Sequence, residues 1–151
     1  MRHGKLAFAL LGLAALLIAA EPFAGPWKLN SAKTKYKTGT APKEQTLTIA
    51  EAGSDLDVTL SGTAADDTAI TSHYTVPAKG GEGKIIESRY EAVSGKRMGP
   101  SQREITYSKG GKAVLTTHSK ISADGKTLTV NVKGTDAQGK PVDAVAVYDK
   151  Q

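Results

Sequence analysis

The sequence predicts an all-β fold, a single antiparallel up-and-down β-barrel of about 8–10 strands. From Gln45 onward, apolar and polar residues alternate with a period of two, as they do in half-buried strands. Turn residues interrupt this alternation about every eight to fourteen residues, and no helical periodicity is present. A run of short hairpins closes into a barrel because closure removes the exposed strand edges.

The expected strands follow one another with short connections. Leu47 and Ile49 share one face of the second strand and threonines occupy the other, so one face of this strand is expected to point inward. Asp124-Gly125 marks a hairpin, because a type I′ turn needs positive φ at both central positions. Residues 30–44 are polar and lysine-rich and are expected to form an extended loop over one barrel end, with little helix. The strands are expected at residues 24–29, 45–50, 55–60, 69–76, 84–86, 89–93, 102–108, 113–121, 127–133 and 143–149.

Residues 1–20 have the layout of a cleaved secretory signal peptide. Arg2 and Lys5 precede an apolar run over residues 6–20, which is shorter than the roughly 20 residues needed to span a bilayer. Cleavage after Ala20 or after Ala24 leaves a small residue at the cut, and cleavage after Ala20 is favoured. The pattern predicts a periplasmic or secreted protein.

Residues 21–151 are expected to form one domain, since a chain of this length buries a single core. Removal of Arg2 and Lys5 lowers the formal net charge from +5 to +3, and the remaining lysines are scattered, which argues against a nucleic-acid partner. The absence of cysteine excludes disulfides, cysteine metal ligands and a lipid-modified cysteine. Five tyrosines, one tryptophan and two phenylalanines are too few for the aromatic girdles of an outer-membrane barrel, so the processed chain is not expected to be membrane-integral.

Gly25, Pro26 and Trp27 form a G-x-W motif that resembles the first strand of lipocalins and of the wider calycin barrels. FAGPWKLN at residues 23–30 resembles the opening F-x-G-x-W-K-L of intracellular fatty-acid-binding proteins. DGKTLTV at 124–130 and AVAVYDK at 144–150 resemble their penultimate region and their final strand. The chain also resembles a group of exported bacterial proteins that begin G-x-W-K-L-N and close on V-x-V-Y-D. The resemblance implies a lipocalin-like barrel.

In the calycin pattern the tryptophan closes one end of the barrel, where the first and last strands meet, and a basic side chain of the last strand covers its ring. The resemblance therefore implies a structural plug made of Trp27 and Lys150. Gly25 is expected to be glycine because the neighbouring backbone passes close to the ring. A structural role is expected for both Gly25 and Trp27, in preference to direct contact with a ligand.

Three residues are candidates for ligand binding: Arg103, Tyr107 and Tyr148. Fatty-acid-binding proteins hold the ligand carboxylate with an arginine two residues before the last-strand tyrosine. Here Tyr148 is retained but Ala146 stands in the arginine position, and the two lid helices are replaced by residues 30–44. An inward Arg103, on one face with Ile105 and Tyr107, would serve as an internal anion anchor. The favoured alternative is a surface Arg103 paired with Glu87, Glu91 or Glu104.

No residue pattern indicates catalysis, a metal or a cofactor. His73 and His118 lie on distant strands among hydroxyl residues without a third ligand, so both are expected to face solvent. Asp55 and Asp57 alternate with apolar residues and are expected on an outer face. The predicted function is non-catalytic binding of a small apolar or amphipathic molecule in the barrel. The alternative is a structural or interaction module of the cell envelope that works through residues 30–44.

Overall fold

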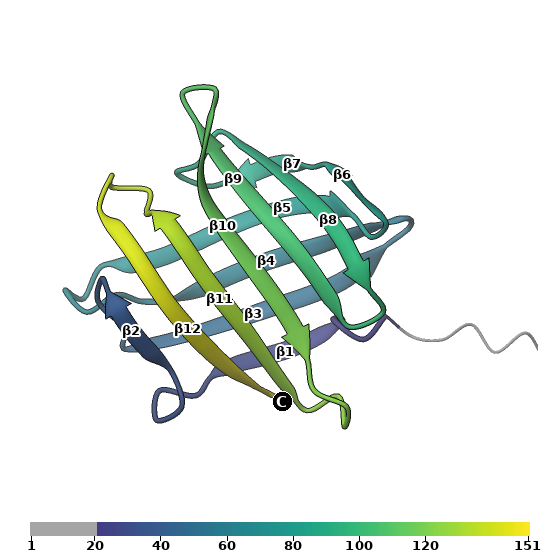
Figure 1. Ribbon diagram of the computed structural model, residues 1–151, viewed down its shortest axis with the longest axis horizontal. Coiled ribbons are helices and arrows are strands. Elements are labelled where there is room, and N and C mark those ends of the chain that lie inside the picture. The colour runs from purple at the N-terminus through teal and green to yellow at the C-terminus, as the bar shows by residue number, and fades with distance from the viewer. Residues whose placement is uncertain (1–20) are drawn as a thin grey trace, which may run out of the picture.

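The computed structural model describes residues 21–151, which form one antiparallel β-barrel without helices (Figure 1). Residues 1–20, where the sequence predicts a signal peptide, lie outside the described residues. Within residues 21–151, no helical segment has the length and apolar character needed to cross a membrane. The strands are β1 (Gly25–Leu29), β2 (Lys35–Thr38), β3 (Glu44–Ala52), β4 (Asp55–Thr63), β5 (Ala69–Pro77), β6 (Gly80–Glu82), β7 (Lys84–Glu87), β8 (Ala92–Gly99), β9 (Gln102–Lys109), β10 (Lys112–Ile121), β11 (Thr127–Thr135) and β12 (Pro141–Lys150).

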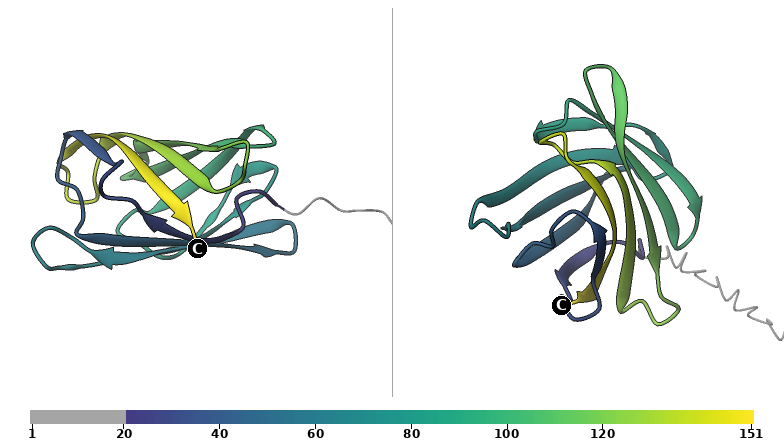
Figure 2. Two further views of the ribbon diagram at one scale, coloured as in Figure 1. Left: turned by 90° about the horizontal axis from the view of Figure 1, so that it is seen from below. Right: turned by 60° about the vertical axis from the view of Figure 1, so that its left-hand side comes forward.

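The strands pair in the order β6-β8-β9-β10-β11-β12-β1-β3-β4-β5-β7, and β2 pairs with β12. In Figure 1, β8 to β12 form the layer nearer the viewer, and β1, β3, β4 and β5 cross behind them in another direction. Figure 2 shows the same sheet curling round from one layer into the other. The predicted all-β, up-and-down barrel is confirmed, with consecutive hairpins as its main connections.

The first and last strands meet, as the resemblance implies. Trp27 lies opposite Lys150 and Leu29 opposite Tyr148 in the β1–β12 pairing. The other edge of β1 pairs with β3, so the first strand is held on both sides. β2 then continues along β12 beyond β1, with Tyr36 opposite Ala144.

The barrel closes through one short segment of chain that changes partners halfway. β6 pairs with β8, and β7 pairs with β5 on the other side of the closure. Gly83 stands between the two strands and donates its N–H to the carbonyl of Val93 at 2.8 Å. A Cβ atom on Gly83 would lie 2.3 Å from the carbonyl oxygen of Thr75, so only glycine fits at this crossing.

The inward faces of the strands make one apolar core. Leu56, Val58 and Val76 are each 1% exposed, and their strands alternate as the sequence predicts. Phe23 and Trp27 are fully buried and fill the end of the barrel near the amino terminus of β1. With no disulfide in the chain, this packing and the strand ladders hold the fold together.

Three local expectations are wrong. Residues 30–44 contain a strand, β2, because the edge of β12 beyond β1 is open to pairing. Residues 89–91 are not a strand: the Ser88 hydroxyl accepts the N–H of Tyr90, and β8 begins only at Ala92. The Asp124-Gly125 turn is not type I′, since among these two only Gly125 has positive φ. The Asp124 carboxylate instead accepts the Ser122 hydroxyl, which favours a longer loop.

Candidate ligand-binding cavity

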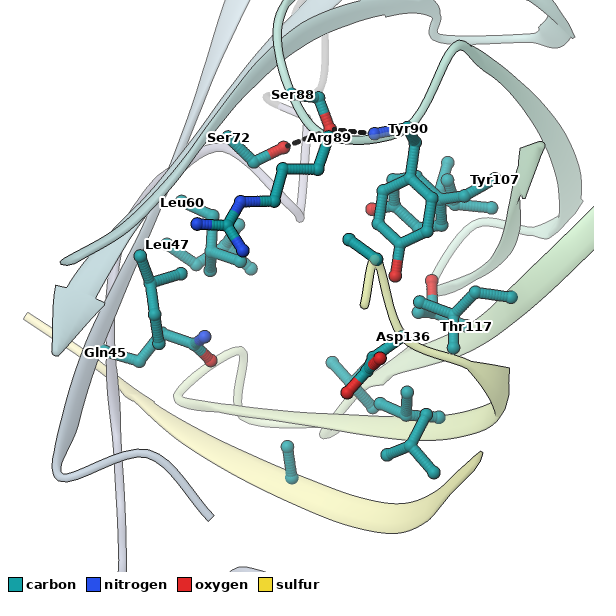
Figure 3. Close-up of a pocket in the computed structure, with 18 of the residues that line it drawn as sticks. Gln45, Leu47, Leu60, Ser72, Ser88, Arg89, Tyr90, Tyr107, Thr117 and Asp136 are labelled. Atoms are coloured by element: carbon teal, nitrogen blue, oxygen red, sulfur yellow. Dashed lines mark hydrogen bonds between the residues drawn. The ribbon is translucent and has the colours of Figure 1, made fainter. Parts of the chain in front are cut away.

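A cavity of about 370 Å³ lies inside the barrel (Figure 3). It is lined by nearly every long strand, and small ligands bind in cavities of roughly 300–1,000 Å³. Aliphatic side chains form much of its wall: Leu47, Val58, Leu60, Ile70, Ile105, Leu115, Val130, Val132 and Val142. The cavity therefore offers an apolar volume large enough for a small molecule.

The connections at one end of the barrel form the mouth of the cavity. Ala64, Thr68 and residues 88–90 and 136–138 line it from three different loops. Figure 3 shows the Arg89 side chain reaching over the opening, with Asp136 across from it. The opposite end carries the buried Phe23 and Trp27, and Trp27 does not line the cavity. The barrel thus has an open end and a closed end.

Arg103, on β9, is the one charged residue among the buried residues of the described chain, with 6% of its surface exposed. It lines the cavity, and its guanidinium carbon lies 4.8 Å from the centroid of the Phe23 ring. Its Nε and Nη1 atoms are buried and have no hydrogen-bond partner within residues 21–151. Burial lowers the pKa of Arg103, although nearby Tyr74 and Tyr107 favour the charged form. A buried cation with unused donors favours an anionic partner.

Arg97 lies against the same phenylalanine ring, and each of its three guanidinium nitrogens donates a hydrogen bond. Its carbon is 5.4 Å from the Phe23 centroid, and its Nη1 donates to both carboxylate oxygens of Glu21 at 3.0 Å. Its Nε and Nη2 donate to the carbonyls of Gly99 and Pro100 at 2.7 and 2.6 Å. Arg97 is therefore a structural clamp, whereas Arg103 is left with free donors.

Tyrosine hydroxyls supply the other polar groups of the cavity. All five tyrosines of the chain line it: Tyr36, Tyr74, Tyr90, Tyr107 and Tyr148. The hydroxyl oxygens of Tyr74 and Tyr107 are 2.9 Å apart, and their rings are edge to face with centroids 5.7 Å apart. The ring centroid of Tyr90 lies 4.9 Å from that of Tyr107. Burial raises the pKa of all five phenols, and burial together with Asp136 raises the pKa of Tyr90 to about 12. The phenols therefore act as neutral hydrogen-bonding groups.

The cavity brings the three predicted ligand-binding residues together. Arg103, Tyr107 and Tyr148 all line it, from β9 and β12. The favoured expectation of a surface Arg103 paired with a glutamate is wrong, because the period-two register of β9 places it with Ile105 on the inner face. Tyr148 donates its hydroxyl to the Gln45 side chain on β3.

Four further residues of the site were missed by sequence reasoning. Tyr74 stands on an inward face that the alternation predicts, so its position was available from the sequence. Gln45, Tyr90 and Phe23 carry no such signal, because Gln45 is a polar residue at the start of β3, Tyr90 lies in a loop and Phe23 lies before β1. Only the closure of the barrel places them beside Arg103 and Tyr148.

The predicted plug has the expected geometry. Trp27 is fully buried, and the Nζ atom of Lys150 lies 5.3 Å from its ring centroid. The reason for Gly25 differs from the expected one: its φ is +134°, and a Cβ atom would lie 2.9 Å from Cε of Lys150. The close neighbour is therefore the covering lysine rather than backbone.

The histidines lie apart from the cavity lining. His73 pairs with Asp57 across β4 and β5 at 2.9 Å, and His118 contacts Gln102 at 3.2 Å. Both histidine side chains are half-buried, so the expectation that they face solvent holds only in part. In residues 21–151, no three acidic or histidine side chains are grouped to hold a metal ion.

Comparison with known proteins identifies the fold. No protein-family model matches the chain, and no curated protein matches it. The zebrafish ileal bile acid-binding protein, solved with cholic acid, aligns over 86% of this chain and 99% of its own, with 18% identity and a TM-score of 0.50. The redesigned β-barrels mFAP1 and mFAP0, each bound to DFHBI, align over 85% of this chain and 95% and 99% of theirs, at 12% and 15% identity, with TM-scores of 0.47 and 0.45. The barrel fold of this chain is therefore similar to that of the zebrafish ileal bile acid-binding protein.

Proposed function

We propose that this protein binds a small amphipathic anion inside the barrel, without catalysis. One observation carries the proposal: Arg103 is buried beside the cavity and has two guanidinium nitrogens without partners in residues 21–151. A buried arginine is stabilised by a carboxylate, sulfate or phosphate group that accepts its hydrogen bonds. The hydroxyl pair of Tyr74 and Tyr107, which acts on the charge of Arg103, uses one hydrogen in its own hydrogen bond and has the other available as an additional donor for the same group.

The apolar wall supports an amphipathic ligand over a small inorganic anion. Leu47, Leu60 and Ile70 line the same cavity as Arg103. A ligand that brought only charge would leave this surface in contact with trapped water, which costs free energy. The zebrafish neighbour was solved with cholic acid, an amphipathic acid, which agrees with this class of ligand.

Export is part of the proposal, with cleavage after Ala20. The signal-peptide pattern of residues 1–20 supports export. The pairing of Glu21 with Arg97 and the complete burial of Phe23 support a first residue at Glu21, because cleavage after Ala24 would remove both. Intact mass of protein recovered from a cell fraction outside the cytoplasm tests this choice.

A pair of fluorescent probes tests the ligand class. Anilinonaphthalene sulfonate and N-phenylnaphthylamine differ in the sulfonate group alone, so their affinities separate the anionic contact from the apolar one. We expect the sulfonate to bind the protein at least about tenfold more tightly, since a hydrogen bond to a charged group contributes about 1.5–3 kcal/mol. Equal affinity for the two probes would contradict the proposal that the ligand is an anion. Failure of both probes to bind would contradict the proposal that the cavity is a binding site.

Arg103→Met tests the anchor directly. The variant should lose the preference for the sulfonate and keep its affinity for the neutral probe within about twofold. Lys96→Met, which removes an exposed cation from neighbouring β8, is the matched control and should retain the preference. Residues 30–44, the site of the alternative interaction function, present no comparable unpaired buried group within the described chain.

A further inference from the structure

The largely buried carboxylate of Glu21 lies near Arg103, the cavity arginine whose buried nitrogens have no hydrogen-bond partner. The Glu21 side chain is 10% exposed and belongs to a turn closed by the Ala24 N–H and the Glu21 carbonyl at 3.0 Å. The indole N–H of Trp27 donates to the Phe23 carbonyl at 2.9 Å and fixes this turn beneath the barrel. Glu21 therefore has a defined position at the closed end.

Glu21 is close enough to Arg103 to act on its charge. Burial lowers the pKa of Arg103, and the Glu21 carboxylate is among the groups that oppose this effect. Arg97 carries a like charge and therefore lowers the pKa of Arg103 further. The two guanidinium groups thus lie against the ring of Phe23 at the closed end, and the carboxylate of Glu21 pairs with one of them, Arg97.

The carboxylate of Glu21 is bound mainly by Arg97, and its Oε1 atom also accepts a long hydrogen bond, 3.4 Å, from the N–H of Phe23. Both oxygens of Glu21 accept from Nη1 of Arg97, and the rest of that guanidinium group is anchored on the carbonyls of Gly99 and Pro100. The buried Nε and Nη1 atoms of Arg103 donate no hydrogen bond to Glu21, although an internal ion pair would satisfy them. Because Glu21 pairs with Arg97, the buried nitrogens of Arg103 are left without a partner.

We infer that Arg97 is a positioning residue for the anion site, which holds Glu21 away from Arg103 and so keeps Arg103 open to the ligand's acidic group. The inference rests on the proposed function. In the absence of Arg97, Glu21 is free to turn to Arg103 and become an internal counter-ion that competes with the ligand. The chemistry that this arrangement favours is a carboxylate, sulfonate or similar acid on an apolar body.

The test is a cycle of variants in the full chain, with the same two probes. Arg97→Met should weaken binding of anilinonaphthalene sulfonate by about tenfold or more, because an internal carboxylate now competes for Arg103. Binding of N-phenylnaphthylamine should stay within about twofold. The double variant Arg97→Met/Glu21→Gln should restore sulfonate binding to within about threefold of the wild type, since the competing charge is gone.

Three outcomes overturn the inference. The first is unchanged sulfonate binding in Arg97→Met, and the second is a double variant as weak as the single one, which would show a structural loss. The third is an equal weakening of both probes. Leu128→Ala, in the core and outside the cavity lining, controls for lost stability and should leave the ratio of the two affinities unchanged.

If Arg97→Met does not fold, a pair of less disruptive variants at the same position tests the inference. Arg97→Lys retains a cation for Glu21 and should preserve sulfonate binding within about threefold, whereas Arg97→Gln should weaken it by about tenfold. Equal binding by these two variants would also overturn the inference. The wild-type preference for the sulfonate decides the proposed function separately, because it involves no change at Glu21 or Arg97.

Discussion

Lys150 covers Trp27 from the strand that pairs with it: the Nζ atom lies 5.3 Å from the centroid of the indole, and the two residues face each other in the β1–β12 register. The same indole donates its N–H to the carbonyl of Phe23. The closed end of the barrel thus depends on contacts between the first residues of the described chain and its last strand.

Truncation of the plug should strongly destabilise the fold. Trp27→Ala removes a fully buried indole, and we expect the free energy of unfolding to fall by about 3–5 kcal/mol in urea melts. Lys150→Met keeps the aliphatic cover and loses the charge, so it should cost only about 0.5–1 kcal/mol. A loss below about 1 kcal/mol for Trp27→Ala would contradict the plug.

Gly25→Ala should destabilise the protein more than Gly53→Ala. Both glycines have positive φ, +134° and +63°, but only at Gly25 does a Cβ atom meet a neighbour, Cε of Lys150 at 2.9 Å. We expect a loss of roughly 1–3 kcal/mol at Gly25, measured by thermal or urea unfolding. An equal loss at both sites would show that the contact with Lys150 contributes nothing.

Arg103→Met should stabilise the protein while abolishing its preference for anionic ligands. The substitution replaces a buried cation with two unpartnered nitrogens by an apolar side chain of similar length. We expect the free energy of unfolding, without ligand, to rise by about 1–3 kcal/mol. A destabilised Arg103→Met variant would indicate that the arginine serves the fold instead of a ligand.

The hydroxyl pair of Tyr74 and Tyr107 should behave as one unit. Each single change to phenylalanine leaves the other buried hydroxyl without its 2.9 Å partner and should cost about 1–2 kcal/mol. The double change removes both and should cost less than the sum of the two. Additive losses in this double-mutant cycle would mean that the hydroxyls do not interact.

Stability should fall at alkaline pH. The folded chain raises the pKa of all five tyrosines and so holds their protons more tightly than the unfolded chain does. Their contribution is complete below about pH 10, the unfolded value, and is lost as the pH rises through the folded values, which for Tyr90 is about 12. Urea melts at about pH 8 and about pH 11 should show the decline, and Tyr90→Phe should reduce it.

Strand positions on inner faces were predictable because alternation depends only on neighbouring residues. Leu56 and Val58 illustrate this, since a period of two in the sequence becomes a buried face in β4. β2 was not predictable, because Lys35 to Thr38 pair only where β12 runs past the end of β1. The same limit applies to Tyr90, whose loop position shows no pattern and whose place at the cavity depends on barrel closure.

The sequence by itself determined the barrel class and the inner faces of the long strands, because these follow from local periodicity. The resemblance of its G-x-W motif to calycin barrels implied the pairing of Trp27 with the last strand. The tertiary structure alone decided that Arg103 is inside and unpaired. That outcome depends on Glu21, Phe23 and Arg97, which meet only when the amino-terminal turn packs beneath β8 and β9. Whether a buried charge is compensated is set by contacts between distant segments, which no local pattern records.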